Sequence, residues 1–300
     1  MRYLLVGFGN IGRKRKQLLG ERCVATVDPY NSSADFANAA DCPLDRYEAA
    51  ILSVPNPNKL ELLGYFLNQG KHVLIDKPLL LPDRATGERL AQLAQQHGAS
   101  WCTSYNHRHE PNIVSLKQAL DRGVLGELYH GRFFYGNGTV QNVVGSWRDQ
   151  GLGVLEDLGT HLLDLSDYLL GYGGSDFEVV TVESHEARSP DHCVLTSADR
   201  RVILEASFLC WKNTFSIDLF GERGSLHVYG LEKWGPASLT QRNRVFPSGV
   251  PIETVESTPG WTDVTWQRDL DHFERVVALG ATSVESDWWI SRTLHGLTRP

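Results

Sequence analysis

Cysteines are scarce in this chain, and their spacing excludes two kinds of stabilising site. The five cysteines are odd in number and never form a Cys-x-x-Cys pair. The sequence therefore predicts neither a disulfide framework nor a zinc site, and a reducing compartment such as the cytoplasm is expected.

Long apolar runs and an excess of positive charge are lacking as well. No apolar stretch approaches the roughly 18 residues that a membrane-spanning helix needs, and a strand is expected to begin directly after Met1, leaving no room for a signal peptide. The formal net charge is −7, and no basic stripe occurs beyond Arg13-Lys14-Arg15-Lys16, which is expected to be a solvated helix face. These absences argue against membrane insertion and against nucleic-acid binding.

Three spaced glycines near the start of the chain form its strongest motif. An apolar run is followed by Gly7, Gly9 and Gly12 in a G-x-G-x-x-G pattern, and then by a helical stretch. Such a turn lets backbone N–H groups approach a pyrophosphate. The next apolar strand, 23–27, ends at Asp28, where an acidic side chain would bind the adenosine ribose. The motif predicts a dinucleotide site, the alternative being a glycine-rich turn in another α/β protein.

Strands and helices alternate through the first third of the chain. Strands are expected over 49–54, 72–75 and 100–105, with one helix ending at Gly70 and another over 85–97. This alternation is typical of a parallel sheet, which binds ligands beyond the carboxyl ends of its strands. The predicted cofactor-binding residues are Gly7, Gly9, Asn10, Ile11, Gly12, Asp28, Ser53, Val54, Pro55, Asn56, Asp76, Lys77 and Asn106.

The pattern changes from about residue 125, where longer runs with period-two alternation begin. Consecutive strands of this kind indicate an antiparallel sheet. A helix over 155–170 is expected to interrupt them, and helices over 263–278 and 286–297 to end the chain. The expected strands are 128–135, 177–183, 194–197, 201–208, 213–219 and 225–229.

Asp157 and His161 are four residues apart on the interrupting helix, so both project from one face. A carboxylate at that spacing can fix the tautomer of a histidine that acts as a general base near neutral pH. Gly151 and Gly153, just before the helix, are expected to let backbone approach a ligand. The alternatives are a surface ion pair, or a metal site with Asp164 that lacks a fourth ligand at a recognisable spacing.

Lys77 is the other candidate for chemistry. It follows a predicted parallel strand and precedes Pro78, so it can place a positive charge beside a substrate hydroxyl; the alternative is a solvated surface lysine. His107, Arg108 and His109 could suggest a metal, but side chains two residues apart do not converge on a helix. The triplet is therefore expected at the surface or in contact with substrate, and no metal site is predicted.

Together these motifs resemble the Gfo/Idh/MocA family of nicotinamide-dependent oxidoreductases, which includes glucose–fructose oxidoreductase and inositol dehydrogenase. Residues 70–78 match the family's G-K-H-V-x-x-E-K-P, 105–108 match Y-N-x-R, and 157–161 match D-x-G-x-H. The resemblance covers nearly the whole chain. It implies α/β architecture, with a Rossmann NAD-binding domain over 1–108 and, over 109–300, an α+β domain for substrate binding and oligomerisation with an open, mostly antiparallel sheet.

The resemblance also implies the roles of individual residues. His161 would take the hydroxyl proton, Lys77 would orient and polarise that oxygen, and Asp157 would steady the histidine and the substrate. Asp28 favours NAD over NADP, because a carboxylate repels a 2′-phosphate. The implied substrate-binding residues are Lys77, Arg108, Trp147, Arg148, Asp157 and His161.

The sequence departs from the family pattern in four places. Asp76 replaces a glutamate, Lys59 replaces a histidine often found after the Pro-Asn turn, and the glycines of 151–153 are more widely spaced. The segment 28–49 is short, with room for one helix, so the sheet is expected to lack a strand at that edge. None of these departures removes a predicted catalytic residue.

The predicted function is an NAD(P)-dependent oxidoreductase that transfers hydride between the nicotinamide and a secondary hydroxyl or ketone of a sugar, cyclitol or nucleotide sugar. The alternative is a catalytically silent NAD(P)- or sugar-sensing regulatory protein on the same fold. Lys77, Asp157 and His161 argue against the related reductases of cyclic imines and linear tetrapyrroles. A homodimer or homotetramer is expected through a sheet face, with Trp211 and Trp234 nearby.

Overall fold

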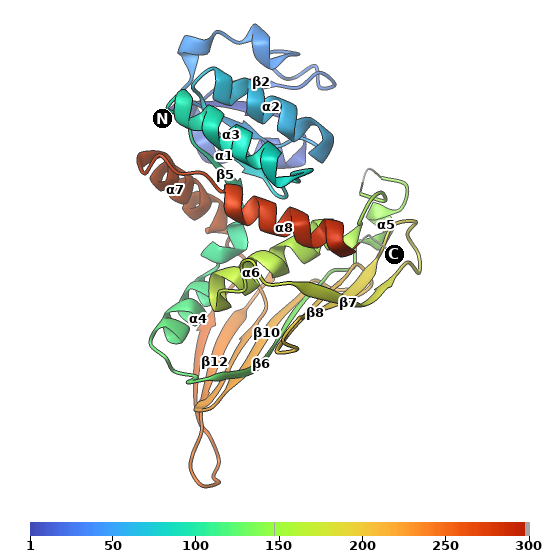
Figure 1. Cartoon of the computed structure of the whole chain (residues 1–300), viewed down its shortest axis with the longest axis vertical. Helices are drawn as coiled ribbons and strands as arrows, with labels where there is room; N and C mark the ends of the chain where they lie inside the picture. Colours follow the sequence, from blue (N-terminus) through green and yellow to red (C-terminus); the bar gives the residue numbers. More distant parts are fainter. Residues whose placement is uncertain (147, 298–300) are drawn as a thin grey trace. The chain divides into compact units, whose positions relative to one another are not determined.

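The computed structural model describes residues 1–146 and 148–297, which form two compact units (Figure 1). The first unit comprises Met1–Asn106 and Trp266–Arg292, and the second comprises His107–Thr265 with the end of the chain. The sequence predicts a domain boundary at residue 108 and assigns 266–292 to the second domain, whereas in the structure 266–292 belong to the first unit. Within the described residues, no helix combines the length and apolar character needed to cross a bilayer.

The first unit is built on sheet A, in which five parallel strands lie in the order β2-β1-β3-β4-β5. Short, apolar, almost wholly buried strands of this kind are typical of a parallel sheet that is covered on both faces. The strands are β1 (Tyr3–Val6), β2 (Cys23–Val27), β3 (Ala49–Leu52), β4 (His72–Asp76) and β5 (Trp101–Ser104).

Helices cover both faces of sheet A, because alternate residues of each strand point to opposite sides. Leu4 and Val6 belong to one core with residues of α2, α3 and α8, whereas Tyr3 and Leu5 belong to a second core with residues of α1 and α7. The two final helices of the chain thus complete the layers on either face of this sheet. The helices are α1 (Asn10–Leu19), α2 (Asn56–Asn68), α3 (Arg84–Gln96), α7 (Thr265–Ala278) and α8 (Val284–Leu297).

The second unit is built on sheet B, an eight-stranded sheet in the order β13-β12-β11-β10-β6-β9-β8-β7. Every neighbouring pair is antiparallel except β6 and β9, which are parallel. The strands are β6 (Leu128–Gly136), β7 (Phe177–Glu183), β8 (His192–Ser197), β9 (Val202–Ser207), β10 (Thr214–Gly221), β11 (Gly224–Tyr229), β12 (Ala237–Asn243) and β13 (Ile252–Thr258).

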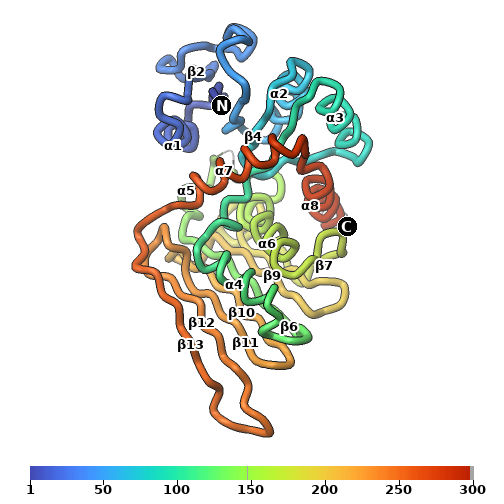
Figure 2. The backbone as a smooth tube through the Cα atoms, turned by 90° about the vertical axis from the view of Figure 1, so that its left-hand side faces the viewer, coloured from blue at the N-terminus to red at the C-terminus, as the bar shows by residue number. Residues whose placement is uncertain are grey.

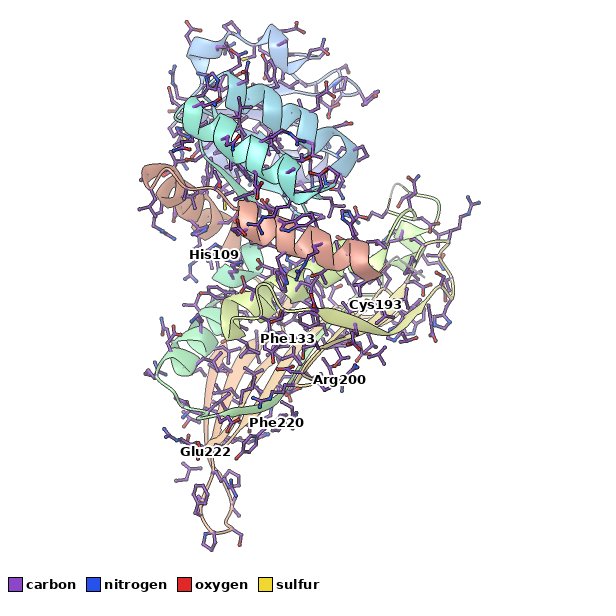
Figure 3. All side chains as sticks on the ribbon, in the orientation of Figure 1. His109, Phe133, Cys193, Arg200, Phe220 and Glu222 are labelled. Atoms are coloured by element: carbon purple, nitrogen blue, oxygen red, sulfur yellow. The ribbon has the colours of Figure 1, made fainter. Side chains whose placement is uncertain are left out.

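Two helices, α4 (Pro111–Asp121) and α6 (Thr160–Leu170), cover one face of sheet B (Figure 2). Phe133, labelled in Figure 3, lies on the helix-covered face and is fully buried. The opposite face, which we call the outer face, carries more exposed side chains at alternate positions, among them Ile203 and Tyr229. A short helix, α5 (Val140–Val143), follows β6.

The predicted fold class is confirmed, and most predicted elements are present within two residues of their expected ends. Helix α4 and strands β12 and β13 were not predicted. Strand β13 is exposed along nearly its whole length. Because neither of its faces is buried, its sequence lacks the alternation of apolar and polar residues by which a strand is recognised. The segment 28–49 contains two 3-10 turns, Ala39–Asp41 and Leu44–Arg46, where room for one helix was expected.

Candidate functional site

The glycine turn joins β1 to α1 in the geometry that the sequence predicts. Gly7 has a φ of +92°, and a Cβ at this position would lie 2.2 Å from the carbonyl oxygen of Ser53. A Cβ on Gly12 would lie 2.0 Å from the carbonyl oxygen of Gly7. Both positions therefore require glycine, the first for the tight turn and the second for close packing of α1 on the strand end.

Gly9 differs from its two neighbours in the motif. Its backbone is extended, with φ −81° and ψ −157°, and no described atom lies within 4 Å of where a Cβ would stand. The space above Gly9 thus suits a pyrophosphate that approaches the backbone. Close by, the Oγ of Ser53 is buried and has no hydrogen-bond partner among the described residues. The open cradle and the unpartnered hydroxyl both fit a dinucleotide.

Asp28 lies directly after β2 and supports the glycine turn. Its carboxylate oxygens accept hydrogen bonds from the backbone N–H groups of Phe8 and Tyr30, both at 2.8 Å. The side-chain amide of Asn31 donates to the carbonyl oxygen of Phe8 at 2.8 Å. Asn31 was not predicted, because its role depends on a bond to a residue 23 positions earlier. The carboxylate of Asp28 is therefore held against the glycine turn, directly after the second parallel strand.

The remaining predicted cofactor residues lie at the same edge of sheet A, since the carboxyl ends of parallel strands share one edge. Asn10 and Ile11 open α1, Val54 and Pro55 lie between β3 and α2, and Asn56 opens α2. Asp76 ends β4, and Lys77 follows it. Asn106 is buried in the 3-10 turn that follows β5.

Lys59 holds the chain on both sides of Lys77. Its buried ammonium donates to Asn56 Oδ1 at 2.7 Å, to the carbonyl oxygen of Pro78 at 2.8 Å and to the carbonyl oxygen of Asp76. These last two residues flank Lys77, so one cation fixes the backbone that carries the predicted catalytic lysine. Lys59, which replaces the family histidine, therefore acts as a clamp on this backbone. The peptide bond from Lys77 to Pro78 is cis.

Substitution of Lys59 by methionine is expected to lower the free energy of unfolding by about 2–4 kcal/mol, because the buried carbonyl oxygens lose their donor. Urea denaturation measures the effect. The matched control is Lys14→Met at an exposed position of α1, which is expected to stay within about 0.5 kcal/mol of wild type. A loss below about 1 kcal/mol for Lys59→Met would show that the ammonium is not a clamp.

Arg15 is fully buried, so the expectation that the basic run forms a solvated face is wrong for this residue. Its guanidinium bonds Asp76 at 2.7 Å and Asp269 at 3.1 Å, and it lies 4.4 Å from the ring centroid of Trp266. Burial lowers the pKa of Arg15, the two carboxylates raise it, and the net direction is upward. Because its guanidinium contacts a carboxylate on each of two other elements, Arg15 ties α1 to the end of β4 and to α7.

Asp157 and His161 lie in one continuous helical segment of the second unit. Asp157 is in a π-helical stretch, Leu155–Gly159, which runs directly into α6, and His161 is in the first turn of α6. Helices of this type are rare and occur frequently at functional sites. Gly171 ends the helix in the left-handed conformation. His161 is buried, and Asp157 is about a quarter exposed.

His107 stacks on His161 and is buried, so of the two places expected for this triplet, the surface or a contact with substrate, the surface is wrong for His107. The ring centroids are 3.9 Å apart with an interplanar angle of 25°, and His107 is 1% exposed. Tyr135 of β6 packs on both rings, at 5.4 Å from His107 and 6.0 Å from His161. Burial, followed by the charge of Asp157, raises the pKa of Tyr135. Trp234 packs on Tyr135 at 5.7 Å, so it belongs to this cluster on the helix-covered face.

Arg108 and Asp164 form a partly buried ion pair. The guanidinium donates from Nε to both carboxylate oxygens, at 2.8 and 3.0 Å, and from Nη2 at 2.5 Å. Asp164 is thus engaged by a cation rather than available as a metal ligand. In the described part of the chain, no group of three His, Cys, Asp or Glu side chains could hold a metal ion.

Gly153, in the loop before the helix, takes a different role from the approach to a ligand that is expected of it. A Cβ on Gly153 would lie 2.2 Å from the carbonyl oxygen of Pro190, so this glycine packs against the chain's own backbone. Arg148 Nε lies 4.0 Å from Asp157 Oδ2 and is partly exposed. Trp147, predicted to contact substrate, lies outside the described residues.

The parallel sheet, its glycine turn and the acidic residue after β2 define a dinucleotide-binding protein of the Rossmann class. Residues 1–105 match a family model described as "Oxidoreductase family, NAD-binding Rossmann fold", and residues 113–227 match the "GFO/IDH/MocA C-terminal domain". The chain therefore belongs to the Gfo/Idh/MocA family of oxidoreductases, and the predicted resemblance is confirmed.

Curated relatives have modest identity to this chain. An uncharacterised oxidoreductase of Escherichia coli, YdgJ, is 32% identical over 61% of the chain and 54% of its own length. The scyllo-inositol 2-dehydrogenase (NADP(+)) IolW of Bacillus subtilis is 24% identical over 62% of the chain and 52% of its length. The chain thus spans about half the length of these two relatives.

Solved structures share the fold over nearly the whole chain. Levoglucosan dehydrogenase in complex with NADH and levoglucosan has a TM-score of 0.80 at 16% identity, covering 99% of this chain and 96% of its own. A 3-ketoreductase from Actinomadura kijaniata in complex with TDP-benzene and NADP has a TM-score of 0.78 at 18% identity, with the same coverage. At these identities the likeness establishes the fold.

Proposed function

We propose that this protein is an NAD(P)-linked oxidoreductase that converts a secondary hydroxyl of a sugar, cyclitol or nucleotide sugar to a ketone, or carries out the reverse reaction. The observation that carries the proposal is the open cradle above Gly9, bordered by Asp28 and followed along the same sheet edge by Lys77. Relatives named for inositol, levoglucosan and a dTDP-linked ketosugar support this substrate class.

The cofactor would be held by the glycine turn, by Asp28 at its ribose and by Ser53 and Asn56 after β3. When bound, it supplies the carbon that accepts or donates hydride. The chain's own residues handle the proton and the orientation of the substrate.

Lys77, Asp157 and His161 are proposed as the catalytic residues. The ammonium of Lys77 donates a hydrogen bond to the reacting oxygen and stabilises the negative charge that develops there. A neutral His161 accepts the hydroxyl proton on a ring nitrogen, so that an O–H bond breaks as an N–H bond forms. Asp157, one turn earlier, favours the resulting imidazolium. Arg148 is proposed to bind an acidic group of the substrate. Arg108, which is held by Asp164, is proposed to contribute to binding the same group.

A panel of sugars, inositols and nucleotide sugars, followed at the NADH absorbance, tests the proposal in wild type and in His161→Ala. Turnover with one class, lost in the variant while cofactor binding survives, is expected. Tight cofactor binding without turnover on any member would favour the sensing protein instead.

NAD is the proposed cofactor, because the charge of Asp28 repels a 2′-phosphate. Asp28→Asn keeps an oxygen that can accept from Phe8 N–H and removes the charge. The variant is expected to improve the Kd of NADPH relative to that of NADH by about tenfold, equal to about 1.4 kcal/mol. Fluorescence titration of both cofactors measures the ratio. An unchanged ratio, or a wild-type preference for NADPH, would contradict the role of Asp28.

A homodimer or homotetramer through the outer face of sheet B is also proposed. Ile203 and Tyr229 on that face are 40% and 47% exposed, which is more than is expected of apolar side chains on a strand covered by other elements. Light scattering at micromolar concentration is expected to show an oligomer for wild type and a monomer for Ile203→Lys combined with Tyr229→Lys. Val250→Lys, at an exposed position between β12 and β13, is the control. A monomeric wild type would refute this assembly.

The cytoplasm is the proposed location, supported by the five cysteines, which are free thiols in the structure.

A further inference from the structure

Lys233 lies at the far edge of the stacked histidine pair. Its Nζ is 3.0 Å from Nε2 of His107, and the ring of His161 stacks on the ring of His107 with the two centroids 3.9 Å apart. Lys233 is in the 3-10 turn Glu232–Trp234, and its ammonium also lies 4.8 Å from the centroid of Trp234. The ring of His107 thus contacts both the ammonium group of Lys233 and His161, the proposed general base.

The hydrogen bond between Lys233 and His107 defines the protonation of His107. A charged ammonium group only donates, so a charged Lys233 assigns the acceptor role to Nε2 of His107 and leaves the ring neutral with its proton on Nδ1. A neutral ring polarised by a cation at one edge is a poor neighbour for a second positive charge. Protonation of His161 would place such a charge directly against this ring.

We propose that Lys233, acting through His107, is a positioning residue that keeps His161 neutral and able to accept a proton. The inference rests on the proposed function only in calling His161 the base, because the effect on its protonation exists without substrate. His107 and Lys233 come from two turns more than 120 residues apart, and neither belongs to the predicted catalytic set.

Other charges near the pair act in both directions. Asp157 favours the imidazolium form of His161, and Arg148 offsets part of that effect at 4.0 Å. Asp164 is neutralised locally by Arg108. Burial raises the pKa of Glu110 to about 7, and Lys233 partly counteracts this shift. Among the described residues, the titratable and charged groups linked to the pair or to its neighbours are Asp157, Asp164, Tyr135, Arg108, Glu110, Arg148, Glu232, Lys233 and Asp263.

The net effect of Lys233 has a definite sign. Removing its positive charge favours the imidazolium form, so the pKa of His161 rises and the neutral form is lost at a higher pH. The acidic limb of the rate profile then moves to higher pH, whereas the rate above that limb stays at the wild-type value. A merely structural role for Lys233 would lower the rate at every pH and would not move the limb.

The test is an NMR titration of the histidine ring signals in the full-length protein without ligands, with the His161 signal assigned by its loss in His161→Gln. Lys233→Met is expected to raise the pKa of His161 by about one unit. Lys233→Arg, which keeps charge and donor, is expected to restore the wild-type value. Lys212→Met, at an exposed position of the same unit, is the control and is expected to change nothing.

An unchanged or lowered pKa of His161 in Lys233→Met would overturn the inference, even if the wild-type protein turns over substrate. Should that variant not fold, Lys233→Gln keeps a donor to His107 without the charge and is expected to give the same upward shift. An upward shift in a protein that shows no turnover would support the effect of Lys233 and count against the proposed function. The two failures are therefore distinguishable.

Discussion

Substitution of Lys77 by methionine is expected to lower kcat by about 10²–10⁴-fold while the protein stays folded. The side chain follows β4 at the sheet edge that carries the dinucleotide motif, and Lys59 fixes the backbone on both sides of it. Methionine keeps much of the volume but cannot donate to the reacting oxygen. Steady-state kinetics on the substrate found in the panel measures the loss.

The Kd of NADH is expected to change by less than about tenfold in Lys77→Met, since the glycine turn and Asp28 are proposed to make most of the cofactor contacts. Lys14→Met, exposed on α1, serves as the control for loss of a surface charge. Turnover within a few-fold of wild type would show that Lys77 is a solvated lysine without a catalytic role.

Substitution of Arg15 by methionine is expected to lower the free energy of unfolding by about 3–5 kcal/mol. The guanidinium is fully buried between Asp76 and Asp269, and it also donates to Ser104 Oγ at 2.8 Å. Without it, two carboxylates in a poorly solvated environment repel each other and lack a counter-ion. Urea denaturation is the measurement, with Lys14→Met again as the control.

A second variant tests the cause of this loss. The triple substitution Arg15→Met, Asp76→Leu and Asp269→Leu removes all three charges, so its stability is expected to recover most of the difference. Recovery of stability in the triple variant would show that Arg15→Met destabilises the protein because it leaves the two carboxylates without a counter-ion. If Arg15→Met alone costs less than about 1 kcal/mol, the cluster does not hold α1, β4 and α7 together.

Structural features could be predicted from the sequence where the local chemistry of a few neighbouring residues determines them. Gly7 must be glycine because of its positive φ, and Gly12 because of its contact with a carbonyl oxygen, so the motif and the turn coincide. Strand β2 ends at Val27 and Asp28 follows it, as predicted from the apolar run. Gly171 ends α6 for the same local reason.

The sequence was insufficient where the role of a residue depends on distant partners. Arg15, Lys59 and His107 have polar or charged side chains that are more often exposed, yet each is almost wholly buried. Asp269, a partner of Arg15, and Lys233, a partner of His107, are more than 100 positions away, and Lys59 donates to the carbonyl oxygens of Asp76 and Pro78, 17 and 19 positions away. Likewise, only the folded chain shows that 266–292 join the first unit.

The most direct test of the account is an anaerobic fluorescence titration with NADH of wild type and Gly9→Val. The backbone of Gly9 suits any residue, and apart from its chain neighbours no described atom lies within 4 Å of where its Cβ would stand, so the variant is expected to fold with wild-type stability. The account predicts saturable binding by wild type and its loss in the variant, whose side chain fills the space of the pyrophosphate. Equal binding by both proteins, or no binding by wild type, would contradict the dinucleotide site on which the proposed function depends.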